Sequence, residues 1–283
     1  MATPTRNLGK VGLRKMQVIG LCRFSYPALG GFQVLHDTTE DRMAYLWSKE
    51  RLEERFRLLE TVALPCLRAQ TDPDFDLLML ISDQFPKHHE DRLRDLTADL
   101  RQVTIRKEPP HNNRKILKFL LNEARRDPSR PCIQFRHDDD DACAVDFVEK
   151  LRAAAHENRH LVKKHKAVTF DWNQGYVAEI SKDVVAGAEI YRAFYVSALG
   201  MHIRGDCNLT IHNFMHERIP RYMPCVTYND AAMFIRTHNG YNDSRQKEVK
   251  AIPVTPLTPD EEALFLDRFA VDINEVKRVF AKP

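Results

Sequence analysis

Glycine is scarce in this chain, with ten residues among 283. Neither a G-x-G-x-x-G string nor a G-x-x-x-x-G-K-S/T string occurs. These strings form the usual glycine-rich loops that cradle phosphate groups, so both common types are excluded. If the chain binds a nucleotide, other groups must hold it.

Long apolar runs are also missing. The longest, Leu77 to Ile81, lies between Asp76 and Ser82, whereas a membrane span needs roughly 18 apolar residues. We therefore expect no transmembrane segment. The N-terminal stretch MATPTRNLGKVGLRK carries scattered basic residues but no apolar core of a secretory signal. The expected location is cytoplasmic.

The chain has no C-x-x-C pair, and its six cysteines are widely spaced. This spacing favours neither a zinc knuckle nor a disulfide scaffold. We expect reduced thiols in apolar surroundings. The cysteines are Cys22, Cys66, Cys132, Cys143, Cys207 and Cys225.

A strong excess of one charge is absent as well. The 43 Lys and Arg residues nearly balance the 40 Asp and Glu residues, which leaves a net charge of +3. Bulk charge of this size does not indicate a nucleic-acid partner. Any anion-binding site must therefore be a local cluster.

What is present is an alternation of strand-like and helix-like runs. Short apolar runs that alternate with helical patterns indicate a mostly parallel sheet flanked by helices, which is an α/β fold. The expected strands are 16–22, 74–83, 103–109 and 132–138, and the expected helices are 39–69, 87–100, 113–127 and 144–159.

The expected helix 39–69 is amphipathic. Leu52, Phe56, Leu59 and Ala63 recur at helical spacing, and the pattern places Glu and Arg side chains on the other face. Pro65 is a point where this helix could be interrupted. We predict one long helical segment.

The pattern changes after residue 160. Residues 166–181 and 189–204 are strand-like, with no helix between them, and indicate an antiparallel or mixed part. The tail beyond Pro253 predicts amphipathic helices. Because no linker or repeat separates the halves, we expect one domain over 1–283.

Four consecutive aspartates, Asp138 to Asp141, follow the expected strand 132–138. They repel one another unless a cation is present. One interpretation is a solvated turn that caps a helix beginning near Ala142. The other is a binding site, because ligands of open α/β sheets bind at the carboxyl ends of the strands. Oxygen-rich sites suit Mg²⁺ or Mn²⁺ bridging a diphosphate.

Several stretches resemble one family of enzymes. They are the Cys-Arg-Phe loop after the first strand, DFDLLMLISD, QFRHDDDDACAVDFVEKL and FIRTHNGYNDS. Together they resemble the rhamnosyltransferase group of bacterial glycosyltransferases with a GT-A type fold, from about Gln17 to Ser244. In the group's RLDxDDA pattern, His137 stands here in the Leu position.

This resemblance implies metal-dependent hexosyl transfer from a nucleotide-sugar. The D-x-D motif of the group corresponds to Asp138 and Asp140. We expect Asp138 and Asp139 to contact the donor, and Asp140 to bind Mn²⁺ or Mg²⁺. A further metal ligand from the C-terminal part of such enzymes corresponds to His238.

Other interpretations of the histidines stay open. His238 could be a surface loop residue, although the turn-forming residues after it favour a positioned loop. His212 and His216 compete for the role of metal ligand, since their spacing would place both on one helix face. The sequence contains no HExxH string around them.

Basic and aromatic side chains near two strand ends are candidates for donor binding. Arg23 could pair with the diphosphate or the base, or form a surface salt bridge. Phe24 and Tyr26 could stack on a nucleobase or pack in the core. Arg114 follows Asn113 at the start of a helix, where an anion is favoured. Arg136 could neutralise the aspartates.

An inverting transferase also needs a carboxylate base near the acceptor hydroxyl. Asp230 is the first candidate, followed by Asp171 and Glu189. Asp230 could instead cap a helix over residues 231–236.

The sequence thus predicts a glycosyltransferase whose residues 15–160 bind a nucleotide-sugar and whose residues 161–283 shape the acceptor site. The acceptor would be a glycan, a lipid or a small molecule, and a lipid acceptor would bring peripheral membrane contact. A metal-dependent phosphoesterase and a non-catalytic nucleotide- or glycan-binding module are the alternatives.

Overall fold

The structure is a computed structural model that describes residues 16–30, 36–239 and 252–282. The expectation for the N-terminal stretch MATPTRNLGKVGLRK lies outside these residues. Within the described part, the strands form a seven-stranded sheet and a five-stranded sheet. No described helix combines the length and the apolar character that crossing a bilayer requires.

The larger sheet has the strand order β10-β6-β9-β4-β1-β2-β3. Only β9 runs antiparallel to its neighbours; every other pair in this sheet is parallel. The carboxyl ends of β1 and β4 therefore lie side by side. The strands are β1 (Gln17–Arg23), β2 (Asp76–Ser82), β3 (Val103–Glu108), β4 (Cys132–Arg136), β6 (Ala167–Trp172), β9 (Leu199–Ile203) and β10 (Cys225–Tyr228).

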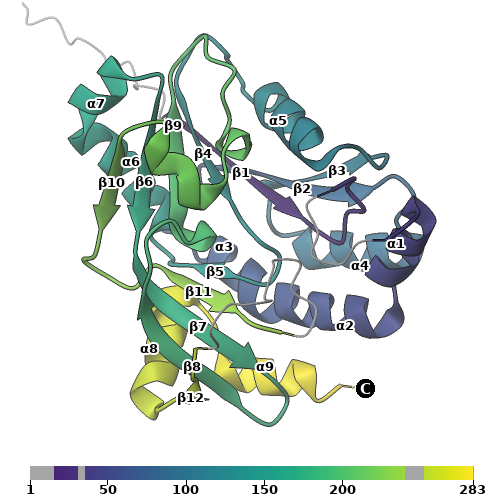
Figure 1. The fold of residues 1–283 in the computed structure, drawn as a ribbon. Helices are drawn as coiled ribbons and strands as arrows, with labels where there is room; N and C mark the ends of the chain where they lie inside the picture. The colour runs from purple at the N-terminus through teal and green to yellow at the C-terminus, as the bar shows by residue number, and fades with distance from the viewer. Residues whose placement is uncertain (1–15, 31–35, 240–251, 283) are drawn as a thin grey trace, which may run out of the picture.

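Helices cover both faces of this sheet (Figure 1). On β2, Leu77 and Met79 pack toward one hydrophobic cluster with helices α2, α4 and α6, while Leu78 and Leu80 pack toward another with α5. A strand buried on both faces is a continuous apolar run, as DFDLLMLISD is. These helices are α2 (Lys49–Leu58), α4 (Lys87–Thr97), α5 (Asn113–Glu123) and α6 (Phe147–Glu157).

The smaller sheet joins the middle of the chain to its C-terminal part. Its order is β12-β8-β7-β11-β5, and β11 is parallel to β7 but antiparallel to β5. Figure 1 shows the β7–β8 pair beside the two C-terminal helices. The elements are β5 (Ala142–Cys143), β7 (Gln174–Ile180), β8 (Val185–Tyr191), β11 (Phe234–Thr237), β12 (Thr255–Pro256), α8 (Pro259–Phe269) and α9 (Ile273–Phe280).

The predicted α/β fold class, with a mostly parallel central sheet flanked by helices and a mixed C-terminal part, is confirmed. The remaining elements are short. They are α1 (Thr39–Leu46), α3 (Leu64–Arg68), α7 (Arg159–Lys164), the π-helical turn η1 (Leu59–Ala63) and the 3₁₀ turns η2 (Val196–Ala198), η3 (Ile211–Asn213) and η4 (His216–Arg221).

The predicted long helix over 39–69 is divided into α1, α2, η1 and α3. Ser48 occupies the N-cap position of α2, which separates it from α1. Pro65 has no N–H to donate and crowds the preceding turn, and the chain widens into the π-helical turn η1 directly before it. The broken helix still presents its apolar face to the sheet.

Candidate functional site at the carboxyl end of the central sheet

The four aspartates lie in the turn between β4 and β5, at the carboxyl end of the central sheet. Asp138 has 35% of its side chain exposed, whereas Asp139, Asp140 and Asp141 retain 4%, 6% and 2%. The expected helix near Ala142 is wrong, because Ala142 and Cys143 form β5 and pair with β11. The aspartates are therefore not a helix cap.

Arg55 neutralises two of the buried carboxylates. Its Nε donates to Asp139 Oδ2 at 3.1 Å and its Nη1 to Asp140 Oδ2 at 2.8 Å, and its Nη2 pairs with Asp139 Oδ1. Pairing of this kind is what buried charges require. The expectation that α2 turns its arginines outward is wrong here, since Arg55 is 4% exposed. Its position three residues after Leu52 and four before Leu59 places it on the apolar face.

Asp141 is held by groups from two later segments. Ser197 Oγ donates to its Oδ2 at 2.6 Å, and the backbone N–H of Thr237 donates to its Oδ1 at 3.0 Å. Arg236 Nη1 lies 3.7 Å from Oδ2. Burial raises the pKa of Asp141 to about 7, with Asp140 adding to the rise and Arg236 opposing it. Asp141 therefore joins the aspartate turn to β11.

Asp138 has a different electrostatic environment. Burial alone would raise its pKa, but Arg136 and Arg236 hold the pKa of this carboxyl below its usual value. Arg236 Nη1 lies 4.0 Å from Asp138 Oδ2. Asp138 is therefore a carboxylate at neutral pH, and it is the member of the cluster that a ligand can reach.

The end of β11 and the residues directly after it contact the aspartate turn. Thr237 Oγ1 donates to the carbonyl of Asp140 at 2.8 Å, and Asn239 Nδ2 donates to Asp140 Oδ2 at 3.2 Å. His238 lies between them, and its backbone N–H donates to Ala178 O at 2.8 Å. Burial and the Arg236 cation lower the pKa of His238, so its imidazole is neutral at pH 7. The turn residues from Gly240 onward lie outside the described residues.

The side-chain arrangement gives no support to the metal site that the resemblance implies. Within the part of the chain that the structure describes, no three His, Cys, Asp or Glu side chains are placed to share one ion. The carboxylates of Asp139 and Asp140 face the guanidinium of Arg55, which already supplies positive charge. Ligation of Mn²⁺ or Mg²⁺ by Asp140 and His238 stays a prediction that these contacts do not support.

Arginines line the other side of the turn. Arg23 ends β1 and its Nη1 donates to Asn113 Oδ1 at 3.2 Å, at the start of α5. Arg114 follows in the first turn of α5, and Arg136 ends β4. The topology thus brings Arg23 and Arg114, the two predicted donor-binding arginines, to one edge together with Arg136.

The aromatic residues beside Arg23 belong to the core. Phe24 is fully buried, with its ring centroid 4.7 Å from that of Phe56. Tyr26 is 2% exposed, and its hydroxyl donates to Pro109 O at 2.6 Å. The alternative of core packing is therefore correct for both residues. Neither ring is open to a nucleobase.

The two competing histidines do not share a helix face. His212 lies in η3 and His216 in the separate turn η4, so the predicted helical spacing is wrong. His216 Nδ1 contacts Phe194 O at 2.6 Å. Burial, followed by the cations Arg136 and Arg23, lowers the pKa of His212 well below its usual value.

The base candidates lie in three different environments. Asp230 Oδ2 pairs with Lys150 Nζ at 2.7 Å, and this contact lowers the pKa of Asp230. Residues 231–236 do not form the predicted helix, since 234–236 belong to β11, so Asp230 does not cap a helix there. Asp171 is fully buried, and Glu189 accepts a hydrogen bond from Gln174. A role for Asp230 as base stays a prediction.

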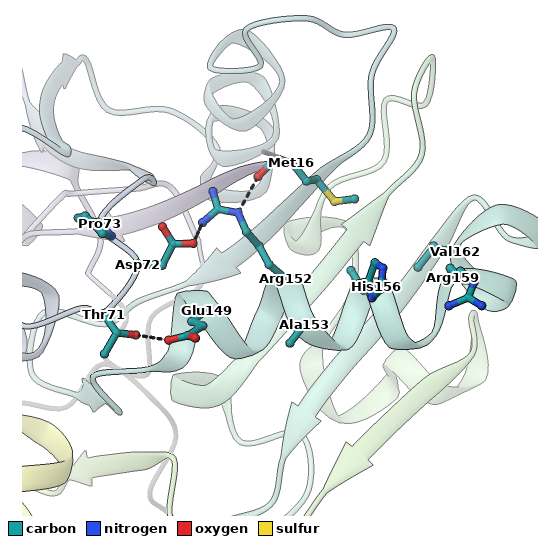
Figure 2. Close-up of a pocket in the computed structure, with 11 residues that line it drawn as sticks. Met16, Thr71, Asp72, Pro73, Glu149, Arg152, Ala153, His156, Arg159 and Val162 are labelled. Carbon is teal, nitrogen blue, oxygen red and sulfur yellow. Dashed lines mark hydrogen bonds and ion pairs between the residues drawn. The ribbon is translucent and has the colours of Figure 1, made fainter. Parts of the chain in front are cut away.

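A hollow of about 740 Å³ lies at the opposite edge of the sheet, along α6 (Figure 2). Its lining includes Met16 and Asp72, which precede β1 and β2 and so mark the amino ends of these strands. Figure 2 shows Arg152 bonded to Asp72 and to the carbonyl of Met16, and Thr71 bonded to Glu149. These polar groups satisfy one another. The arginine-lined carboxyl edge is the stronger candidate site.

The chain matches the family model described as "Putative rhamnosyl transferase" over residues 17–251, and it belongs to that family. It is a glycosyltransferase, as the sequence predicts. No curated protein matches the chain.

Solved structures with low identity were also found. The S. aureus TarS 1-349 structure in complex with UDP has 10% identity and a TM-score of 0.40, and the match covers 94% of this chain and 70% of that one. The structure of TarS 1-349 alone has 9% identity and a TM-score of 0.38. This match covers 79% of this chain, and the chain spans 60% of that structure. A "putative nucleotide-diphospho-sugar transferase" from Desulfovibrio desulfuricans G20 has 10% identity and a TM-score of 0.36. The match covers 79% of this chain and 81% of that one.

Proposed function

We propose that this glycosyltransferase takes its sugar from a nucleotide-sugar and that the donor binds at the carboxyl edge around Asp138. The observation that carries the proposal is the contrast within the aspartate turn. The carboxylates of Asp139, Asp140 and Asp141 are buried and bonded to other groups of this chain. Asp138 is partly exposed, and it is ionised beside Arg136 and Arg236. A carboxylate next to cations can accept hydrogen bonds from sugar or ribose hydroxyls while the cations face phosphates.

The other residues have supporting roles in this proposal. Arg23 and Arg114 face the phosphates of the donor from the ends of β1 and α5. Asp139 and Asp140 hold Arg55, and through it they fix the turn that presents Asp138. Residues 15–160 supply most of the donor site, and the part from 161 to 283 adds β11 and the acceptor side.

In the proposed reaction the bond between the anomeric carbon and the phosphate oxygen breaks. A new bond forms from an acceptor hydroxyl oxygen to that carbon, and the hydroxyl proton leaves to a carboxylate or to water. The nucleoside diphosphate departs with the electron pair of the broken bond. The cations at the edge stabilise the negative charge that develops on it.

A panel of nucleotide-sugars tests this proposal. The wild-type protein should release nucleoside diphosphate from one donor class, by slow hydrolysis even without an acceptor. Asp138→Asn should reduce this release at least about 100-fold, as loss of an essential site group does. Asp127→Asn is the matched control, because Asp127 is exposed in a turn and its side chain bonds the neighbouring Ser129.

Three results would contradict the proposal. The wild type could leave every donor intact, Asp138→Asn could retain full activity, or donors could bind without being consumed. The last result would indicate a non-catalytic nucleotide-binding module. Release of inorganic phosphate from simple phosphoesters would indicate a phosphoesterase.

A further inference from the structure

Three arginines converge on one face of the central sheet. We call Arg23, Arg114 and Arg136 the arginine cluster. Side chains alternate between the two faces of a strand, so Arg23 projects to the same face as Leu21, which packs in the cluster with α5.

Arg136 projects to that face as well. It lies two residues after Gln134, whose Oε1 accepts from the N–H of Ile211 in η3. Arg114 reaches this face from the first turn of α5. The cluster therefore lies between β1, β4, α5 and η3.

Arg136 is the central member. Its Nε is buried, and no group in the described part of the chain accepts a hydrogen bond from it. A buried cationic donor without an acceptor costs free energy. Burial lowers the pKa of Arg136, Arg23 and Arg236 lower it further, and Asp138 is the carboxylate that opposes this. An anion would satisfy both the donor and the charge.

His212 lies in the positive field of the arginine cluster. Its Nε2 is buried with no hydrogen-bond partner among the described residues. After burial, the causes that lower its pKa are the three members of the arginine cluster, Arg136, Arg23 and Arg114. All three cations thus lie close enough to affect the imidazole of His212. The imidazole also offers a ligand its Nε2, which has no hydrogen-bond partner among the described residues.

The carboxylates of the aspartate turn are unequally placed toward the arginine cluster. Asp139 and Asp140 pair with Arg55. Asp141 is bonded by Ser197 and Thr237 on its own side of the turn. Asp138 alone faces the arginine cluster from the aspartate turn. In this turn, three guanidinium groups thus meet a single carboxylate, and this ratio favours a further anion beside Arg136.

We propose that the arginine cluster binds the diphosphate of the donor directly, without a divalent ion bridging the diphosphate to the aspartates. The proposal rests on the proposed function for the nature of the donor. A guanidinium offers a planar fork of donors that matches phosphate oxygens in pairs. Such forks can stabilise the departing diphosphate in the role that a metal fills elsewhere.

Titration calorimetry tests the proposal with inorganic pyrophosphate, UDP, GDP and dTDP as probes, first in EDTA and then with Mg²⁺. Wild-type protein should bind pyrophosphate and at least one nucleotide in EDTA. Arg136→Gln should weaken both interactions roughly 10- to 100-fold, because it removes charge-assisted hydrogen bonds. Arg136→Lys should fall between, since it keeps the charge and loses the fork.

Two controls keep the result interpretable. Arg126→Gln removes an arginine with a 60% exposed side chain at the other edge, paired with Asp76, and should bind like wild type. Arg23→Gln repeats the test if Arg136→Gln has a lowered melting temperature. Arg23 is partly exposed at the strand end, so its replacement should leave the fold intact.

The outcomes separate this proposal from the proposed function. Binding that requires Mg²⁺ would contradict direct binding of the diphosphate by the arginine cluster, even if donors are turned over. The same holds if both Arg136→Gln and Arg23→Gln bind like wild type. Absence of any binding in both conditions would overturn it as well. Pyrophosphate binding in EDTA that depends on Arg136, without consumption of any nucleotide-sugar, would keep the cluster and reject the proposed function.

Discussion

The four neighbouring aspartates carry identical side chains, but the fold gives their carboxyl groups different partners, exposure and pKa values. Asp139 and Asp140 are ion-paired with Arg55, and Asp141 has a pKa raised to about 7 by burial. Asp138 is partly exposed and stays ionised. The difference comes from what each carboxylate faces, which depends on residues far away in the chain.

Asp171 provides a pH-dependent test of the structure at the residue scale. Its Oδ1 accepts the N–H of Phe194 at 2.9 Å, and burial raises its pKa to about 7 against the opposing effects of Phe194 and Thr227. Between about pH 4 and 7 the folded state keeps a proton that the unfolded state has lost. This contribution to stability is therefore present at low pH and lost as the pH rises to 7.

Asp171→Asn should remove this dependence. The variant should gain stability relative to wild type as the pH rises from 4 to 7, by about 1.4 kcal/mol for each unit by which the pKa is raised. Urea unfolding across this range measures the difference, with Asp183→Asn in an exposed turn as the control. A difference between Asp171→Asn and wild type that is constant with pH would contradict the burial of this carboxyl.

The sequence indicated part of the site residue by residue. Asp138, Arg23 and Arg114 could be proposed because strand ends and helix starts are visible as patterns. Arg55 was missed, although its spacing from Leu52 and Leu59 carries the signal, because arginines on an amphipathic helix usually face solvent. The contacts of Asp141 with Ser197 and Thr237 could not be derived, because they depend on non-local packing.

At the scale of elements, β11 is the segment that the sequence pattern misassigned. Residues 231–236 have good helix formers, but the backbone N–H of Ala144 donates to Met233 O, and β11 pairs with both β5 and β7. Tertiary pairing of this kind overrides helix propensity. As a strand, the segment carries Arg236 and Thr237 to the aspartate turn.

Gly175 allows β11 to approach β7. A Cβ at this position would lie 2.5 Å from Phe234 O and 2.6 Å from the Phe234 ring. Gly175→Ala should therefore push β11 away, destabilise the protein by roughly 1–3 kcal/mol, and lower donor turnover by displacing Arg236.

Gly187→Ala on β8 is the matched control. A Cβ there would crowd the tip of the flexible Leu257 side chain at 2.9 Å, which can move, and would lie at ordinary contact distance, 3.5 Å, from Val177 O. Urea unfolding and donor turnover of both variants check the prediction. Equal stability and equal turnover of the two variants would show that the approach of β11 to β7 does not position the site.

At the scale of the whole molecule, the parallel strands decide where chemistry can occur. The carboxyl ends of β1 and β4 meet beside the start of α5, and the C-terminal part returns through β11 to the same edge. Alternating patterns in the first half made this sheet predictable. The insertion of β9 between β4 and β6 was not, because strand order in the second half depends on contacts between distant residues.

The structure of the protein in complex with the nucleoside diphosphate that it releases from its donor tests the central claim most directly. The account predicts a diphosphate within hydrogen-bonding distance of Arg136 and Arg23, with the side chain of Asp138 facing the ribose or the position of the sugar. A nucleotide bound in the hollow along α6, with the carboxyl edge of the sheet left free, would contradict it.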